Sequence, residues 1–146
     1  LSPLMETLYL AADHAGFKLK EQLKPRLKSL GLAMRDLTPS YRPGDDYPGI
    51  GRDLARKTVK DKTRGILVCG SGVGVAIAAN RVKGARAVEA HSTSQMKRAR
   101  EHNDVNVLAL GGWTTTVAGA MRLVKTFLGT KASTAARHRR RIRQLG

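Results

Sequence analysis

Short, unbroken apolar runs alternate with longer amphipathic segments along the chain, and this alternation most constrains the fold. The clearest run, Arg64–Cys69, is apolar at every position after its first residue. Unbroken apolar runs are typical of parallel strands buried on both faces, and strands that alternate with helices favour helices on both sides of the sheet. The sequence therefore predicts an α/β fold in which a parallel sheet lies between two layers of helices.

Five runs are expected to be strands and six segments to be helices. The strands are predicted at 7–12, 32–37, 64–69, 86–90 and 105–110. The helices are predicted at 17–30, 48–59, 75–80, 92–101 and 116–128, with a basic helix or arm from about 132 to 145. Because no internal repeat or second boundary is visible, residues 7–146 are expected to form one domain.

The net charge and the cysteine content limit the classes of binding partner and the cellular compartment that we expect. Lys and Arg total 27 against 11 Asp and Glu, a formal net charge of +16 that attracts anions such as nucleic acids and phosphorylated metabolites. One cysteine cannot form an internal disulfide, which favours a reducing, cytoplasmic location. No membrane span, signal peptide or metal-ligand spacing is visible, so neither a membrane nor a metal partner is expected.

Four polar groupings are expected at the carboxyl ends of strands, where ligands bind in open parallel sheets. They are Asp13-His14, Cys69 with the glycine loop after it, His102-Asn103, and Gly111-Gly112-Trp113. They are distant in sequence but would share one edge of the sheet. Their convergence favours a ligand site more strongly than any one grouping does.

Cys69 and the loop Gly70-Ser-Gly-Val-Gly74 lie where a strand passes into a helix. Glycines let the backbone approach a ligand, and a helix N-terminus offers free N–H groups to a phosphate or to the oxyanion of an enediolate. The loop lacks both the dinucleotide fingerprint and the ending of a nucleotide P-loop. The helix dipole favours a thiolate, which can act as a base on an acidic C–H. A tight turn without a ligand and a buried, inert cysteine are the alternatives.

Histidines and arginines supply further candidates. His14 and His102 could move a proton, although each could equally be a surface or capping histidine. Arg137 and Arg141 lie one helical turn apart in a dense arginine cluster and could bind a phosphate. A solvated basic tail is the alternative for that cluster.

Five sequence blocks occur in order over about residues 7 to 142. They are Asp13-His-Ala-Gly-Phe17, Asp46-Tyr-Pro48, Cys69–Gly74 followed by Ala76–Asn80, Glu101–Asp104 followed by Asn106-Val-Leu108, and Arg137-His138 with Arg141-Ile142. This pattern resembles type B ribose-5-phosphate isomerases and the related allose- and galactose-6-phosphate isomerases. The resemblance implies a Rossmann-like three-layer sandwich with a five-stranded parallel sheet, and no cofactor or metal. It also implies a homodimer, or a tetramer, whose active sites are shared between subunits.

The resemblance further implies that the chain interconverts ribose 5-phosphate and ribulose 5-phosphate through a cis-enediolate. Cys69 would move the proton between C1 and C2, Ser71 with the loop N–H groups would hold the oxyanion, and His102 would help to open the sugar ring. The substrate would be bound by Asp13, His14, Tyr47, Gly70, Gly72, Gly74, Asn103, Arg137, His138 and Arg141.

Two positions bear on this expectation. Some members of the family carry a glutamate base where this chain has Val75, which leaves Cys69 as the evident base. Trp113 stands where many members have an arginine that binds phosphate, so a six-carbon sugar phosphate is the alternative substrate.

Two other functions remain as alternatives, a basic nucleic-acid-binding module and a catalytically silent relative. Aromatic residues make up 4% of the chain, too few for stacking platforms, so only non-specific nucleic-acid binding is expected. The presence of Cys69, His102 and Arg137 argues against a silent relative.

Overall fold

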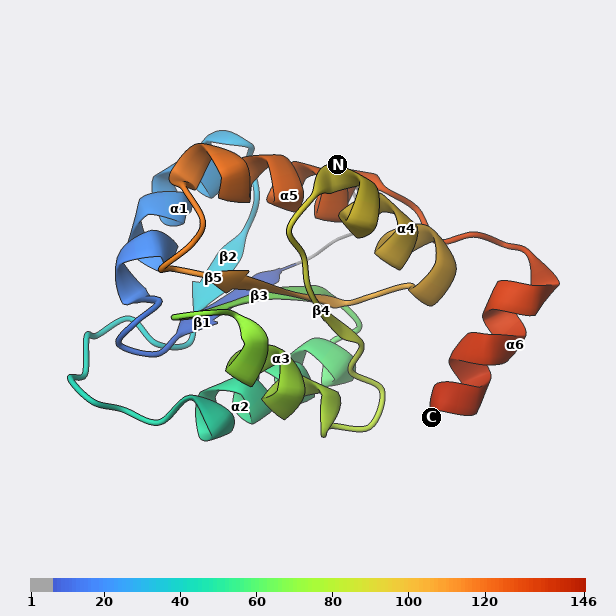
Figure 1. The fold of residues 1–146 in the computed structure, drawn as a ribbon, viewed down its shortest axis with the longest axis horizontal. Coiled ribbons are helices and arrows are strands. Elements are labelled where there is room, and N and C mark those ends of the chain that lie inside the picture. Colours follow the sequence, from blue (N-terminus) through green and yellow to red (C-terminus); the bar gives the residue numbers. More distant parts are fainter. Residues whose placement is uncertain (1–6) are drawn as a thin grey trace.

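The computed structural model describes residues 7–146 and contains one sheet of five parallel strands with helices on both faces (Figure 1). The strands are β1 (Leu8–Ala12), β2 (Met34–Asp36), β3 (Arg64–Cys69), β4 (Ala87–Glu89) and β5 (Val107–Gly111). Their order in the sheet is β2-β1-β3-β5-β4, and every neighbouring pair is parallel. The predicted fold class is confirmed.

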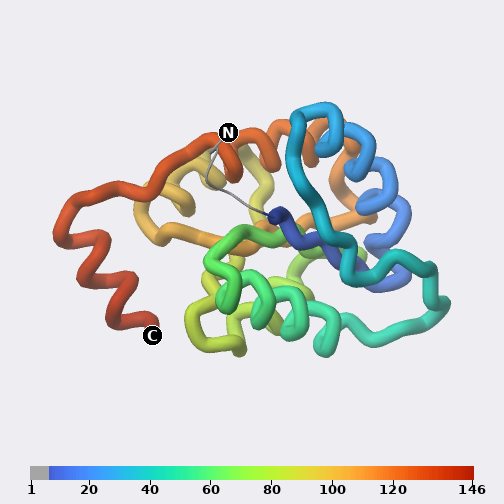
Figure 2. The backbone as a smooth tube through the Cα atoms, turned by 180° about the vertical axis from the view of Figure 1, so that it is seen from behind, coloured from blue at the N-terminus to red at the C-terminus, as the bar shows by residue number. Residues whose placement is uncertain are grey.

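The helices divide between the two faces of the sheet. On one face lie α1 (Phe17–Ser29), α4 (Thr93–Asn103) and α5 (Val117–Gly129), and on the other lie α2 (Tyr47–Lys60) and α3 (Val73–Asn80). The last helix, α6 (Ala136–Leu145), extends away from the sheet and touches the body beside α4 (Figure 2). Among residues 7–146, no helix combines the length and the apolar character needed to cross a bilayer.

Successive residues of each central strand enter different cores, which explains why the strands are apolar at every position. In β3, Ile66 and Val68 pack in the core beneath α1, α4 and α5, whereas Leu67 and Cys69 pack in the core beneath α2 and α3. Burying one such aliphatic side chain contributes about 1.5–3 kcal/mol. The same alternation fixes which face of the sheet the Cys69 thiol occupies.

Two helix boundaries differ from the prediction in ways that matter for function. Helix α3 begins at Val73, not Val75, because Gly72 adopts a left-handed conformation (φ +81°) and starts the helix within the glycine loop. Helix α4 continues to Asn103, two residues past its predicted end, and Asp104 ends it in a left-handed conformation (φ +45°). His102 and Asn103 therefore belong to the last turn of a helix.

A buried ammonium group joins α1 to the end of β2. Lys20 is 1% exposed, and its Nζ donates to Asp36 Oδ2 at 2.6 Å and to the Thr38 carbonyl at 2.7 Å. Thr38 Oγ1 in turn accepts a hydrogen bond from the Ala12 N–H at 2.9 Å. These bonds fix the start of the loop that leads from β2 to α2. The loop carries Asp45 of the candidate site and ends at Tyr47, the first residue of α2.

Candidate active site

The loops after β1, β3 and β5 meet at the carboxyl edge of the sheet. The strand order changes direction between β1 and β3, the position where open α/β sheets bind ligands. The Asp13 N–H donates to the Val68 carbonyl at 3.2 Å, and the Gly112 N–H donates to the Cys69 carbonyl at 2.8 Å. Three of the four predicted polar groupings are thus brought together.

The Cys69 thiol lies at the end of β3, 4% exposed, against the start of α3. The Gly72 N–H donates to its Sγ at 3.1 Å. Ser71 is exposed, and its Oγ accepts a hydrogen bond from the Val73 N–H at 3.2 Å. An N–H donor and a helix N-terminus at the sulfur both stabilise negative charge, so the arrangement suits a thiolate, the form in which cysteine acts as a base.

Two aromatic rings cover the glycine loop. A Cβ added to Gly70 would lie 2.5 Å from the ring of Trp113, and one added to Gly74 would lie 2.6 Å from the ring of Tyr47. A side chain at either position would therefore displace the ring that covers it. The other sides of these rings are open to solvent, since Trp113 is 75% and Tyr47 39% exposed. The loop thus lies between two aromatic walls that a ligand can contact.

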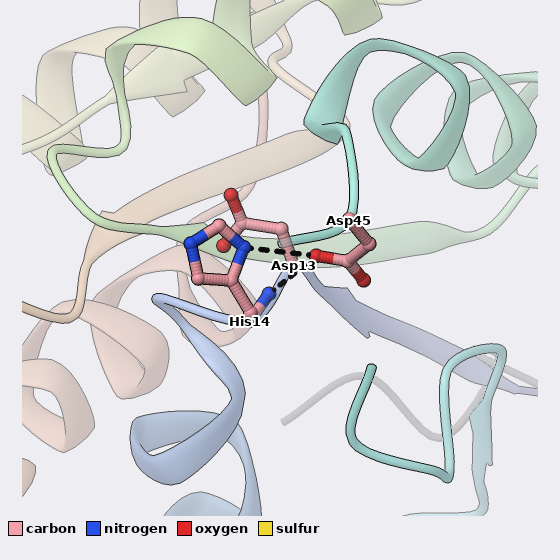
Figure 3. A group of neighbouring side chains, drawn as sticks. All are labelled: Asp13, His14 and Asp45. Carbon is pink, nitrogen blue, oxygen red and sulfur yellow. Dashed lines mark hydrogen bonds and ion pairs between the residues drawn. The ribbon is translucent and has the colours of Figure 1, made fainter. Parts of the chain in front are cut away.

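Asp13 is a buried carboxyl group at the end of β1. It is 6% exposed, and its Oδ1 accepts hydrogen bonds from the N–H groups of Ala15 and Gly16, each at 3.0 Å. Burial raises the pKa of Asp13 above its ordinary value, and the two backbone hydrogen bonds act in the opposite direction. The residue shapes the turn after β1 and presents a polar group close to His14 (Figure 3).

His14 pairs with Asp45, a residue that the sequence reasoning missed. Asp45 Oδ1 lies 3.1 Å from His14 Nδ1 and accepts the His14 backbone N–H at 2.7 Å (Figure 3). The hydrogen bond to Asp45 raises the pKa of His14, so the imidazolium persists to higher pH. The only sequence signal was an Asp-Asp pair before Tyr47, and the chain gives no sign that it faces a residue 31 positions earlier.

Asp13, His14 and Asp45 offer possible metal-ligand atoms that all lie within 4.8 Å of one another. Hydrogen bonds engage one side-chain atom of each residue: His14 Nδ1 pairs with Asp45 Oδ1, and Asp13 Oδ1 accepts two backbone N–H groups. The expectation that the chain needs no metal stays a prediction.

The fourth predicted grouping, His102-Asn103, lies at the opposite edge of the sheet. These residues end α4, and the chain then enters β5 at its amino end, Val107. The five residues of β5 alone span about 13 Å at 3.3 Å per residue, and Cys69 pairs with the far end of that strand. The prediction that His102-Asn103 shares an edge with Cys69 is therefore wrong, because the pair follows a helix and precedes a strand.

The predicted phosphate ligands of α6 join His102 at this opposite edge. The rings of His102 and His138 stack with their centroids 4.3 Å apart and their planes 9° apart. Burial lowers the pKa of His138, and the neighbouring His102, Arg137 and Arg141 lower it further, which favours a neutral ring. Arg137 and Arg141 are exposed. One protomer therefore carries two separate clusters of the predicted site residues.

Comparison with known proteins gives consistent results. The sequence pattern of the Ribose/Galactose Isomerase family matches residues 8–145. A ribose-5-phosphate isomerase B of Mycolicibacterium paratuberculosis is 44% identical over 137 residues, which cover 92% of this chain and 86% of that protein.

Solved structures agree with the sequence match. The crystal structure of a ribose 5-phosphate isomerase from Thermotoga maritima has a TM-score of 0.90 at 36% identity, covering 95% of this chain and 96% of that one. The ribose-5-phosphate isomerase B of Mycoplasma genitalium, with bound ribulose-5-phosphate, has a TM-score of 0.89 at 36% identity. The match covers 95% of this chain and 93% of that one. The family pattern, the sequence identity and the shared fold together show that this chain belongs to the ribose/galactose isomerase family.

Proposed function

We propose that the chain is an aldose–ketose isomerase that interconverts ribose 5-phosphate and ribulose 5-phosphate. The observation that carries the proposal is the Cys69 sulfur, which accepts the Gly72 N–H in a glycine loop that opens a helix. The curated relative from M. paratuberculosis is named for this reaction, and the M. genitalium structure contains ribulose-5-phosphate.

In the proposed mechanism, the Cys69 thiolate removes the proton from C2 of the open-chain aldose and returns it to C1. Negative charge develops on the carbonyl oxygen as the cis-enediolate forms. The first turn of α3 has N–H groups without partners inside the helix, and these groups with the Ser71 hydroxyl would stabilise that charge. The O2 hydroxyl loses its proton as the C2 carbonyl forms, while the C1 oxygen gains one. The proton that O2 loses equals the one that O1 gains, so the two oxygens exchange one proton overall and the reaction balances.

A second copy of the chain completes the site in this proposal. His102, His138, Arg137 and Arg141 lie at the amino edge, whereas Cys69 lies at the carboxyl edge. Proton transfer and phosphate binding need contacts of about 3 Å, so both clusters cannot act on one sugar within a single protomer. A two-fold dimer would place the amino edge of each protomer against the carboxyl edge of its partner and form two equivalent sites.

Helix α6 supports this arrangement. It extends away from the sheet and touches the body beside α4, as both ribbon and tube views show (Figures 1 and 2). Leu145 on this helix is 65% exposed. An arm with an exposed apolar residue and two exposed arginines suits contact with a second subunit and its bound phosphate.

The roles of the remaining residues follow from their positions. His102 would help to open the sugar ring with Asn103 beside it, His14 would bind the phosphate, and Asp13 and Tyr47 would line the sugar pocket. We also propose that residues 7–146 act as one domain and that the protein is cytoplasmic, because a reducing compartment keeps the Cys69 thiol free.

Mixing two inactive variants tests the shared site. Cys69→Ala and His102→Ala should each abolish turnover of ribose 5-phosphate. Dimers formed from an equal mixture of the two should recover about a quarter of the wild-type activity, because half of the dimers contain one intact site out of two. Variants that fail to complement, although native mass spectrometry shows mixed dimers, would refute the shared site.

The substrate assay separates pentose from hexose phosphates. We expect a higher kcat/KM for ribose 5-phosphate than for allose or galactose 6-phosphate. A preference for a six-carbon substrate would overturn the ribose assignment, whereas retained kcat in Cys69→Ala would remove Cys69 from the mechanism.

A further inference from the structure

A cationic cavity opens at the amino edge of the sheet, at the opposite end of the strands from Cys69. Its volume is about 440 Å³, within the range of small-molecule sites. Arg64 begins β3, Arg86 directly precedes β4 and Asn106 directly precedes β5, so the amino ends of three strands form its wall. The rest of the lining comes from the end of α2 and the residues after it, from the connection before β4 and from the end of α4, namely Thr58, Val59, Lys62, Thr63, Gly84, Arg100 and Asp104.

Positive charge dominates this lining. Lys62, Arg64, Arg86 and Arg100 face one carboxylate, Asp104. That carboxylate is already engaged, since Asp104 Oδ1 lies 2.8 Å from Arg100 Nη1 and Oδ2 lies 3.6 Å from Arg86 Nη2. The described residues therefore leave an excess of positive charge in a partly enclosed space, which an anion would neutralise.

Arg64 contacts a backbone carbonyl and an aromatic ring, and within residues 7–146 it forms no ion pair with a carboxylate. Its guanidinium donates to the Phe127 carbonyl and lies over the Phe127 ring, 5.6 Å from the centroid. Burial and, to a smaller extent, the nearby Arg100 lower the pKa of Arg64 to about 10, against the opposite effect of Asp104. The guanidinium has five N–H donors, so most of them remain available to a ligand.

Two independent features point to the same cavity. Thr58 is 0% exposed, and its Oγ1 is the one buried side-chain polar atom in the described part of the chain that lacks a hydrogen-bond partner. Lys62 (φ +52°) and Asp104 (φ +45°) are the non-glycine residues with left-handed backbone within 7–146, and both line this cavity. Glycine would adopt either conformation more easily, yet the chain has a charged side chain at both positions.

Capping of helix ends explains only part of this arrangement. Arg86 Nε donates to the carbonyls of Asn103 and Asp104 at 2.9 and 3.0 Å, and Arg100 Nη1 donates to the Val105 carbonyl at 2.6 Å. These bonds satisfy carbonyl groups at the end of α4. They give no role to Lys62 or to the remaining donors of Arg64.

We propose that this cavity binds the phosphate group of a small phosphorylated metabolite, and its lining contains none of the residues assigned to the isomerase reaction. Arg64, Arg86 and Lys62 contact the dianion. Arginine offers planar pairs of donors that match phosphate oxygens, and lysine adds a point charge. The cavity has room for an organic group attached to the phosphate, which favours an ester over the free ion.

Nuclear magnetic resonance on the full chain tests the proposal. The background carries Arg137→Ala and Arg141→Ala, which removes two phosphate contacts proposed for the isomerase site. Glycerol 3-phosphate should shift the amide signals of Arg64, Gly84 and Asn106 in a saturable way, and glycerol should not.

Three variants locate the binding. In that background, Arg64→Leu and Lys62→Gly should each weaken the affinity for glycerol 3-phosphate about tenfold, as expected for a lost charge-assisted hydrogen bond. Arg56→Leu, on the exposed side of α2, removes the same charge outside the cavity and should change nothing. Because glycine adopts φ +52° without strain, Lys62→Gly should keep the fold even if Arg64→Leu does not.

The results of this experiment distinguish binding at the isomerase site, binding of free phosphate and binding of a phosphate ester. Shifts confined to the Gly70–Gly74 loop, or an affinity that neither cavity variant lowers, would overturn the site. If inorganic phosphate binds as tightly as glycerol 3-phosphate, the assignment of a phosphate ester as the ligand is wrong and the cavity binds free phosphate. Weaker binding of inorganic phosphate supports the metabolite.

Discussion

Replacing the buried Lys20 with methionine should lower the free energy of unfolding by about 2–3 kcal/mol. The side chain is 1% exposed, with Nζ 2.6 Å from Asp36 Oδ2 and 2.7 Å from the Thr38 carbonyl oxygen. Methionine keeps most of the apolar stem but removes the charge and all three donors. Asp36 and the Thr38 carbonyl then lose a partner where little water can replace it.

The magnitude follows from what remains around Asp36. Removing one partner from a buried ion pair costs about 3–5 kcal/mol when the other charge is left uncompensated. Asp36 is 11% exposed and keeps two donors, Lys24 Nζ at 2.9 Å and the Thr38 N–H at 3.0 Å. These donors should offset part of the loss, and the orphaned Thr38 carbonyl should add about 1 kcal/mol.

Lys24→Met is the matched control. Lys24 lies on the same helix and contacts the same carboxylate, but it is 31% exposed, so solvent screens the pair and the loss should be about 0.5 kcal/mol. Urea unfolding followed by circular dichroism, at one fixed protomer concentration, measures both variants. Equal losses from the two, or a loss below about 1 kcal/mol for Lys20→Met, would refute the role given to burial.

The pH dependence provides a second measure of the same prediction. Burial raises the pKa of Asp36, but the hydrogen bonds from Lys20 and Lys24 outweigh it and hold the pKa below its ordinary value. The stabilisation is therefore present above the unfolded-state pKa and is lost as the pH falls through the folded-state pKa. The difference between the wild type and Lys20→Met should narrow below about pH 4.

Three further predictions concern the candidate site. Gly72→Ala should lower the free energy of unfolding by about 1–2 kcal/mol and reduce kcat. Gly72 has φ +81°, and a new Cβ would lie 2.9 Å from the Leu110 carbonyl carbon. Denaturant unfolding measures the first effect and a turnover assay the second. Asp45→Asn should lower the pKa of His14, because the side-chain hydrogen bond to Asp45 is the main cause that raises it. The imidazole should then titrate at lower pH by NMR, and KM should begin to rise at lower pH. An unchanged titration would contradict this. Trp113→Arg should lower KM for ribose 5-phosphate by adding a charged phosphate contact, and an unchanged KM would place the phosphate elsewhere.

The layered fold was predictable because the sheet is buried on both faces, so nearly every strand position is apolar. Leu67 and Val68 are adjacent and both apolar because each enters a different core. The order of the strands in the sheet has no such local signal, since it depends on which runs pair across long stretches of chain.

The candidate site was predictable only where a strand end identifies it. Cys69 and Asp13 directly follow apolar runs, and the structure brings their loops together. His102 was misplaced because helices commonly end at glycine, whereas here Asp104 adopts the left-handed conformation that ends α4. Without a glycine to mark the boundary, the sequence does not show that the histidine is still helical.

The rings that cover the glycine loop constrain the order in which this part of the sequence can change. An alanine at Gly70 meets the Trp113 indole at 2.5 Å, and all three of its closest contacts are indole atoms. If Trp113 first becomes a small residue, those contacts vanish and the same alanine is accommodated. In the reverse order the exposed indole must swing away from the loop, and the aromatic wall that it forms is lost. Gly74 and Tyr47 form a second such pair. In lineages that descend from this chain, the aromatic positions should therefore diverge before the glycines that they cover.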